Sequence, residues 1–397
     1  MIFTTWLYGL FLIVVVAVFW LVPPRLRPWW LLAAGMVFYT NYHPPHVGLV
    51  LAMTLLVYGL ARSAGHVARA PGRALLGVGI LLSLGLLGYY KYTGFVTTTL
   101  VEMGVAPESI ITGAVAERVP LAISFFVFEY VHYLIEIRRG TIVPGSVRDF
   151  LLFIFFFPTL VAGPIKRFND FQPQIGAQTR FDAAEANAGM QRIVVGLAKK
   201  FLVADAVQRL AAPIWDDPLY QSTGMLWLGV YAYAIQILFD FSGYSDIAIG
   251  SAQLLGFHVP ENFAYPYLQP NLARFWRCWH MSLTSWITDY VYIPLGGNRH
   301  GLLRAQGNRL VAMAICGLWH GAAGHFVLWG IYHGLGLNAY QLWRRVRPRL
   351  PLPVSFGWPG RIVATVFTFH FVCIGWVLFV VDATTAQGVI WKLLGAE

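Results

Sequence analysis

Long apolar segments alternate with short polar segments along the whole chain. A helix of about 20 apolar residues crosses the roughly 30 Å hydrocarbon core of a bilayer, and most of the apolar segments have lengths of this order. The pattern therefore predicts an all-α polytopic membrane protein with about nine to eleven transmembrane or re-entrant helices. The apolar segments are residues 2–22, 29–42, 47–61, 74–95, 119–137, 149–165, 190–211, 223–241, 244–257, 310–343 and 362–381.

The composition indicates a membrane protein throughout, rather than a soluble domain with an anchor. Of the 397 residues, 57% are hydrophobic and only 12% are charged, whereas soluble domains carry roughly 25% charged residues. We find no internal repeat and no low-complexity tract, and we predict one integral membrane domain over residues 1–397. Arg25 and Arg27 follow the first apolar segment and no basic residue precedes it, which indicates a retained span rather than a cleavable signal.

The net charge of +10 does not indicate nucleic-acid binding, because the basic residues lie between the apolar segments. This distribution follows the positive-inside rule and predicts a multi-pass protein of the inner (plasma) membrane. Loops 96–118 and 212–222 carry acidic residues and are predicted to be external, as are both chain ends. The predicted cytoplasmic clusters are Arg25/Arg27, Arg62/Arg69/Arg73, Arg138/Arg139 with Lys166/Arg167, Lys199/Lys200, Arg274 to Arg309, and Arg344 to Arg349.

Segment 149–165 does not fit a simple alternation of sides. Basic residues flank it at both ends, and its last part, Phe157 to Pro164, contains two prolines and a glycine. We predict a re-entrant segment. Irregular backbone at membrane depth is tolerated only where protein or a water-filled cavity covers it, so this segment also predicts a cavity in the middle of the protein.

The largest stretch outside the apolar segments is 258–309, which is predicted to lie at the cytoplasmic face. Within it, Arg274 to Pro294 alternates aromatic and polar residues with a roughly helical period. This pattern predicts an amphipathic helix on or dipping into the membrane surface, ended by Leu295 to Asn298.

Segment 310–343 contains no Asp, Glu, Lys or Arg in 34 residues, yet it holds His320, His325 and His333. Its length predicts a helical hairpin broken near Gly321 to Gly324. An ionisable side chain inside a membrane costs at least about 2.5 kcal/mol and by default marks function. Histidine is also suited to moving protons near neutral pH. For His325 and His333, their position in this charge-free segment is the sole indication of a functional role.

A second histidine, His280, lies in aromatic and basic surroundings between Arg277 and Ser282. It is interpreted as an acid/base group, a residue at the entrance of the predicted cavity or an organiser of the amphipathic helix. Arg274 and Arg277 suit contacts to the phosphates of a bound ligand, and contacts to lipid head groups are equally compatible with the sequence.

Polar residues also gather between the apolar segments 223–241 and 244–257. Buried polar groups must be paired, and we favour the interpretation that these residues join neighbouring helices near a tunnel wall. They are Asp240, Ser242, Tyr244, Ser245 and Asp246.

The remaining motifs limit the chemistry. Cys278, Cys316 and Cys373 have no CxxC spacing, and His320 and His325 have no Cys or carboxylate nearby, so no metal site is expected. No GxSxG elbow, P-loop or dinucleotide motif occurs, which argues against a classical serine hydrolase, an NTPase or a dinucleotide enzyme.

Six stretches of the chain resemble the membrane-bound O-acyltransferase family, specifically its bacterial alginate O-acetyltransferase and D-alanyl-transfer branch. Their order, from the first to the last, is also that of the family. They are Pro120–Phe128, Phe157–Arg167, Gln236–Gly250, Asn271–Ser282, Asp289–Arg299 and Gly317–Gly321.

The resemblance implies a many-helix fold that encloses a tunnel, with His320 as the catalytic histidine and His280 as the second family histidine. It implies an acyl donor drawn from the cytoplasm, acetyl-CoA or an acyl-carrier thioester, with no permanently bound cofactor. It also implies a periplasmic or extracellular acyl-transfer partner. The chain departs from the family in its charged stretch Glu129 to Glu136, which is predicted to add a tunnel-lining group, and many relatives are longer at the C-terminus.

Three functions follow as hypotheses. The first is an O-acyltransferase, chiefly an O-acetyltransferase, that acts on an exopolysaccharide or cell-wall glycan with His320 as catalytic base and acid. The second is D-alanyl transfer to teichoic acid from a carrier protein. The third is a transporter that moves an acyl donor or polymer without catalysing transfer.

Overall fold

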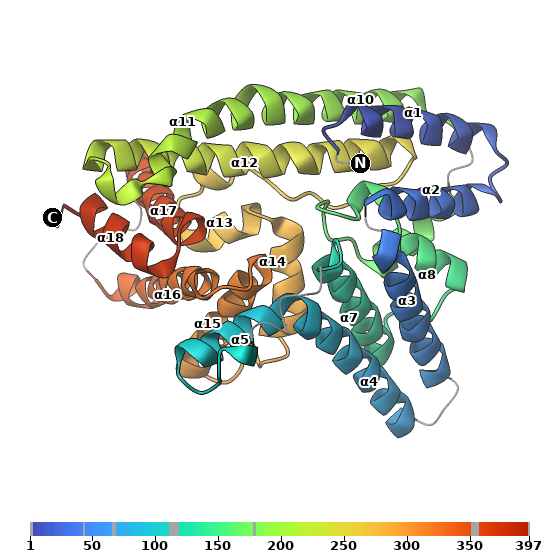
Figure 1. Cartoon of the computed structure of the whole chain (residues 1–397), viewed down its shortest axis with the longest axis horizontal. Helices are drawn as coiled ribbons and strands as arrows, with labels where there is room; N and C mark the ends of the chain where they lie inside the picture. The colour runs from blue at the N-terminus through green and yellow to red at the C-terminus, as the bar shows by residue number, and fades with distance from the viewer. Residues whose placement is uncertain are drawn as a thin grey trace. The chain divides into compact units, whose positions relative to one another are not determined.

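The computed structural model describes residues 3–42, 44–65, 69–110, 119–177, 180–350 and 357–395, and every regular element within them is a helix (Figure 1). The all-α prediction is therefore confirmed. The chain divides into two compact units. The first comprises Met1–Leu197 with Tyr244–Pro260, and the second comprises Ala198–Gly243 with Glu261–Glu397.

The helices of the two units follow the predicted apolar segments closely. The first unit contains α1 (Trp6–Leu21), α2 (Arg27–Tyr42), α3 (Pro44–Ala64), α4 (Arg69–Leu87), α5 (Thr93–Glu102), α7 (Ile123–Arg139), α8 (Val147–Ile154), α9 (Phe168–Phe171) and most of α10 (Ala183–Ala198). The second contains α11 (Asp205–Asp216), α13 (Leu272–Cys278), α14 (Met281–Ile287), α15 (Leu302–His320), α16 (Gly324–Val346), α17 (Gly357–Val380) and α18 (Ala383–Leu393). Helix α12 (Thr223–Leu254) contributes to both.

Several of these helices are long and apolar enough to cross a bilayer. Among the described residues they are Pro44–Ala64, Arg69–Glu102, Thr223–Leu254 and Gly357–Val380, and Trp6–Leu21 is a shorter apolar helix. The span 69–102 is continuous, because the π-helical turn η1 (Gly88–Tyr92) joins α4 to α5. The start of the predicted external loop 96–118 is thus helical as far as Glu102, and Glu117 lies outside the described residues.

The segment predicted to be re-entrant does not cross the bilayer as a helix. Helix α8 has eight residues, which is about 12 Å at 1.5 Å per residue. The chain then leaves the helical conformation at Phe155 and forms the short 3-10 turn η2 (Phe157–Thr159). The side chains of Phe155, Phe156 and Phe157 are fully buried, so protein covers this irregular backbone, as membrane depth demands.

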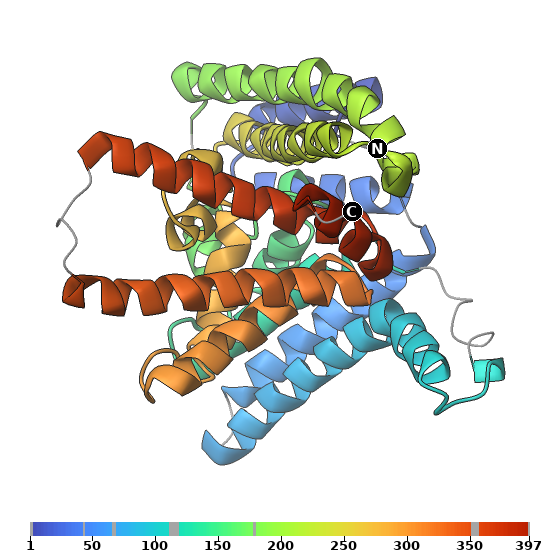
Figure 2. The ribbon, with the colours of Figure 1, turned by 90° about the vertical axis from the view of Figure 1, so that its left-hand side faces the viewer.

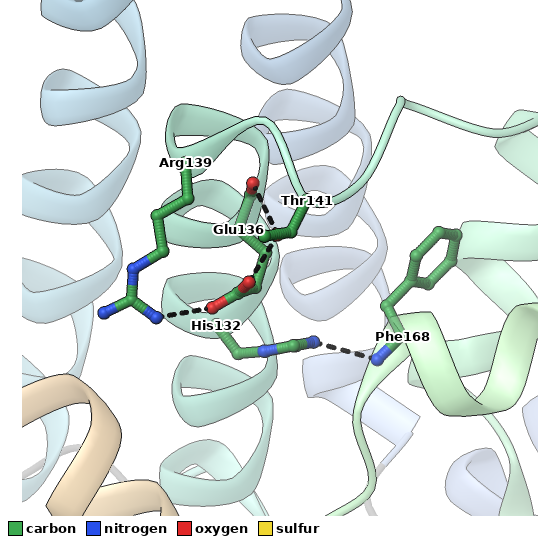
Figure 3. Close-up of polar contacts among 5 residues, drawn as sticks. All are labelled: His132, Glu136, Arg139, Thr141 and Phe168. Atoms are coloured by element: carbon green, nitrogen blue, oxygen red, sulfur yellow. Dashed lines mark hydrogen bonds and ion pairs between the residues drawn. The ribbon is translucent and has the colours of Figure 1, made fainter.

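The charged residues of α7, which were predicted to add a tunnel-lining group, have partners inside the first unit. Glu129 forms a buried ion pair with Lys166. Farther along α7, the backbone N–H of Phe168 donates to Nε2 of His132 over 2.8 Å, and Arg139 donates to Glu136 over 2.7 Å (Figure 3). The contacts of Glu129 and His132 join α7 to the segment that follows α8, whereas the Arg139–Glu136 pair lies within α7.

Two predicted boundaries were wrong. Helix α12 continues for 32 residues through the polar stretch that was taken as a break between two apolar segments. Conversely, the amphipathic helix predicted over Arg274 to Pro294 is interrupted, since α13 ends at Cys278 and α14 begins at Met281. Both errors arise from partners that are distant in the sequence.

The polar residues of α12 do join neighbouring helices, as predicted. In the first unit, Asp246 accepts from Nε of Arg192 on α10 over 3.0 Å. In the second unit, Nζ of Lys200 lies 2.5 Å from Asp240 and 2.9 Å from Asp205. The carboxylates of α12 therefore have cationic partners, which permits an uninterrupted helix.

The predicted hairpin over 310–343 is confirmed. Helix α15 ends at His320 and α16 begins at Gly324, and the two helices pack against each other along their lengths. Glycine permits the close approach: a Cβ on Gly317 would lie 2.0 Å from the carbonyl oxygen of Phe326, and one on Gly330 would lie 2.1 Å from that of Met313.

We expect Gly330→Ala to lower the free energy of unfolding by about 1–3 kcal/mol, because the new methyl group meets backbone that cannot move aside. Thermal or denaturant unfolding in detergent measures this. Gly307→Ala is the matched control, since a Cβ at this position of α15 meets nothing within 4 Å. Equal stability of the two variants would contradict the close-packing argument.

Candidate active site

His280 stands at the interruption between α13 and α14. Asn271 caps α13 by accepting from the backbone N–H of Arg274 over 2.9 Å. At the other end of α13 the backbone of His280 adopts a left-handed conformation with φ of 43°. Such a conformation is uncommon for a residue other than glycine, although histidine adopts it more readily than most residues. The break turns His280 into the protein, where it is 1% exposed.

Asn262 holds this histidine. Its Oδ1 lies 3.2 Å from Nδ1 of His280 and also accepts the hydroxyl of Ser282 over 2.7 Å. The backbone carbonyl oxygen of Asn262 accepts from the backbone N–H of Met281 over 3.0 Å. Because an amide oxygen only accepts hydrogen bonds, the proton of a neutral His280 ring resides on Nδ1. Nε2 then carries a lone pair, and within the described part of the chain it has no hydrogen-bond partner.

The surroundings of His280 favour its neutral form. The edge of Phe241 packs against the ring with 4.6 Å between centroids. Burial, reinforced by the charge that His320 can carry, holds the pKa of His280 well below its ordinary value. His280 is therefore a neutral base with one available nitrogen at physiological pH.

His320 is the last residue of α15, and Gly321 continues the chain in an extended conformation with φ of −162°. The imidazole lies among three aromatic rings, those of Trp319, Trp329 and Phe379, with centroids 4.8, 5.2 and 5.1 Å away. The side chain is only partly buried. The hairpin apex thus places His320 among aromatic rings.

The two histidines belong to one aromatic cluster, although they are forty residues apart in the sequence. The indole ring of Trp319 contacts both, with centroids 5.7 Å from His280 and 4.8 Å from His320. Two imidazoles around one indole provide groups that can accept and return a proton within a small apolar volume.

The predicted phosphate-binding arginines lie on the helix that leads to His280. Arg274 and Arg277 are exposed and three residues apart, so they share one face of α13. Phe275 and Trp276 form its buried face. The arginines are therefore beside the histidine in sequence, and their side chains are exposed on the opposite face from Phe275 and Trp276.

The other two histidines of the hairpin differ in their surroundings, and neither ring nitrogen of His333 has a hydrogen-bond partner within the described residues. Nδ1 of His325 lies 3.0 Å from the carbonyl oxygen of Leu378, which joins the start of α16 to α17. His333 is fully buried among Trp276, Trp329 and Phe371. Within the described residues, no group of three His, Cys, Asp or Glu side chains is arranged to hold a metal ion.

Sequence reasoning missed Asn262 and Trp319. Trp319 precedes His320, so its proximity was visible, but its contact with His280 was not. Asn262 lies in an irregular stretch after Pro260, where local patterns carry little information. Asn262 stands out in the structure because it is a fully buried polar residue. That burial could not be predicted from the sequence of this stretch.

Comparison with known proteins identifies the family. The sequence model of the membrane-bound O-acyltransferase family matches residues 77–381. The chain is 36% identical to the probable alginate O-acetylase of Azotobacter vinelandii, over 98% of this chain and 76% of that protein. It is 30% identical to the peptidoglycan O-acetyltransferase of Helicobacter pylori, over 88% of this chain and 70% of that protein.

A third relative represents the D-alanyl branch. The teichoic acid D-alanyltransferase of Bacillus subtilis is 30% identical over 65% of this chain and 68% of its own length. The family match covers most of the chain, and its range includes both histidines of the aromatic cluster. The chain therefore belongs to the membrane-bound O-acyltransferase family and is a multi-pass acyltransferase of the cell membrane.

Proposed function

We propose that this acyltransferase moves an acetyl group to hydroxyls of an exopolysaccharide or cell-wall glycan, with His320 as catalytic base and acid. The relatives that match nearly the whole chain are named as O-acetylating enzymes of alginate and peptidoglycan, which supports the substrate class. The observation that carries the mechanism is the contact of both imidazoles with Trp319.

In the proposed reaction, His320 takes the proton of the acceptor hydroxyl and then gives it to the leaving thiolate. The acceptor oxygen attacks the carbonyl carbon of the acyl thioester and forms the new C–O bond, while the imidazole takes the hydroxyl proton. The tetrahedral intermediate then breaks its C–S bond, and the imidazolium returns the proton to the thiolate. The aromatic rings beside His320 make its surroundings less polar, which disfavours competing hydrolysis of the thioester.

His280 is proposed as the second acid/base group, because its Nε2 is the available nitrogen of a neutral ring. Arg274 and Arg277 are proposed to bind phosphates of the acyl donor, acetyl-CoA or an acyl-carrier thioester. The donor binds for each turnover, and an extracytoplasmic partner protein completes transfer to the polymer.

D-alanyl transfer is the alternative function, and the teichoic acid relative favours it. The transport hypothesis has less support, because the family and the names of its members indicate catalysis.

The nature of the ester separates the first two functions. We expect the native surface polymer to carry O-acetyl esters that disappear when the gene is deleted and return when it is restored. Mass spectrometry of mild-alkali hydrolysates distinguishes released acetate from D-alanine. Loss of D-alanine with unchanged acetate would replace acetyl transfer by the alternative.

We expect His320→Ala to reduce polymer acetylation by at least about 100-fold, the lower range for loss of general acid–base catalysis. Ester content in a complemented deletion strain measures it, with membrane insertion checked by immunoblot. His325→Ala is the matched control from the same hairpin and should retain most of the activity. Full acetylation by a properly inserted His320→Ala protein would exclude the mechanism.

Asn262→Ala should lower both stability and turnover, because it removes the acceptor of His280 Nδ1 and of Ser282. An unsatisfied buried donor costs about 1–3 kcal/mol. The expected kinetic effect is a fall in kcat with little change in KM for the donor, since the base is misoriented rather than the donor site altered. Ser282→Ala, which removes one of these bonds and keeps the His280 contact, should leave kcat nearly unchanged. Equal kcat values for both variants would argue against a positioning role for Asn262.

A further inference from the structure

A groove separates α16 from α17 in the second unit. The two helices lie close at one end and diverge toward the other, as the orange and red helices of Figure 2 show. Two adjoining cavities of about 430 and 880 Å³ lie between them. Both are lined by Tyr340, Trp343, Ala364 and Phe367, so they form one continuous space, which we call the α16–α17 groove.

The inner part of the groove is apolar. Leu272 and Phe371 line its inner cavity together with Phe367, whose side chain is 72% exposed. Helix α17 is long and apolar enough to cross a bilayer. An exposed aromatic side chain beside a cavity on such a helix suits a hydrocarbon chain rather than water or a soluble ligand.

The outer part of the groove is basic. Arg344 and Arg347, near the end of α16, line the outer cavity with Pro348 and Pro359. No acidic residue is among the residues that line either cavity. The sequence accentuates this charge: between Asp289 and Asp382 there is no Asp or Glu, but there are eight arginines. The lining of the outer groove is therefore positively charged and attracts an anion.

We propose that the α16–α17 groove binds one anionic glycerophospholipid. An acyl chain occupies the inner cavity beside Leu272 and Phe371, and Arg344 and Arg347 contact the phosphate. A phospholipid joins an apolar acyl chain to an anionic phosphate. The acyl chain matches the apolar inner part of the groove, and the phosphate matches its basic outer part. Arginine is suited to this contact, because its guanidinium binds phosphate with two parallel hydrogen bonds.

The α16–α17 groove is separate from the candidate active site. Neither His280 nor His320 lines either of its two cavities. Lipid binding therefore does not depend on acyl transfer. The His320→Ala variant should bind lipid as the wild type does, so failure of one proposal leaves the other testable.

Native mass spectrometry of the purified full chain in mild detergent tests the proposal, with phosphatidylglycerol and phosphatidylcholine as probes. We expect one phosphatidylglycerol to be retained in preference to phosphatidylcholine. Arg344→Gln and Arg347→Gln should each weaken this binding about fivefold, as expected for one cation at a lipid phosphate. Ala364→Trp should abolish it by filling the space shared by the two cavities.

Matched controls come from neighbouring positions that do not line the groove. Arg345→Gln removes the same charge beside Arg344, and Val366→Trp introduces a tryptophan on α17 outside the groove. Both controls should bind phosphatidylglycerol as the wild type does. If Ala364→Trp fails to fold, the two arginine variants still decide the question.

Three results would overturn the proposal. The first is equal binding of phosphatidylglycerol and phosphatidylcholine by the wild type. The second is unchanged phosphatidylglycerol binding by the double variant Arg344→Gln/Arg347→Gln. The third is loss of a dimer in Ala364→Trp, measured by light scattering, with lipid binding intact, because a second copy of the chain would then be the occupant of the groove.

Discussion

Hydrogen bonds and ion pairs between polar side chains of mostly apolar segments hold much of this protein together. Asn262 shows this most clearly, because one side-chain oxygen serves both the His280 ring and the Ser282 hydroxyl. Contacts of this kind also pair Asp246 with Arg192 and bury Lys166 against Glu129. Each of these contacts joins segments that are distant in the sequence, so the polar minority of residues determines how apolar helices are arranged.

The geometry of the candidate site depends on the same kind of contact. A histidine at an ordinary helical position would direct its ring along the helix surface. At His280 the left-handed backbone and the Asn262 contact select both the direction of the ring and the nitrogen that carries the proton. His320 reaches the same cluster by a different route, because the helix that carries it ends there. Aromatic rings contact both imidazoles, and the burial of His280 favours the neutral form of its ring.

The sequence was sufficient to predict the helical class, the broken hairpin that carries His320 and the irregular segment after α8, because each depends on local composition. It was misleading at Ser242 to Asp246, where polar residues resembled a break, since their partners on other helices cannot be read locally. It also failed at His280, where the helical period continued across a real interruption. The contact of Trp319 with both histidines was beyond prediction for the same reason: it depends on packing between segments, not on either segment alone.

The glycine contacts between α15 and α16 have an evolutionary consequence. Glycine is the smallest residue, so every substitution at Gly317 or Gly330 adds atoms where backbone of the other helix already lies within about 2 Å of the new Cβ. These positions have no neutral alternatives among single amino-acid changes. We therefore expect few accepted substitutions at the glycines of the hairpin that presents His320. The exposed faces of the same helices can accept many more.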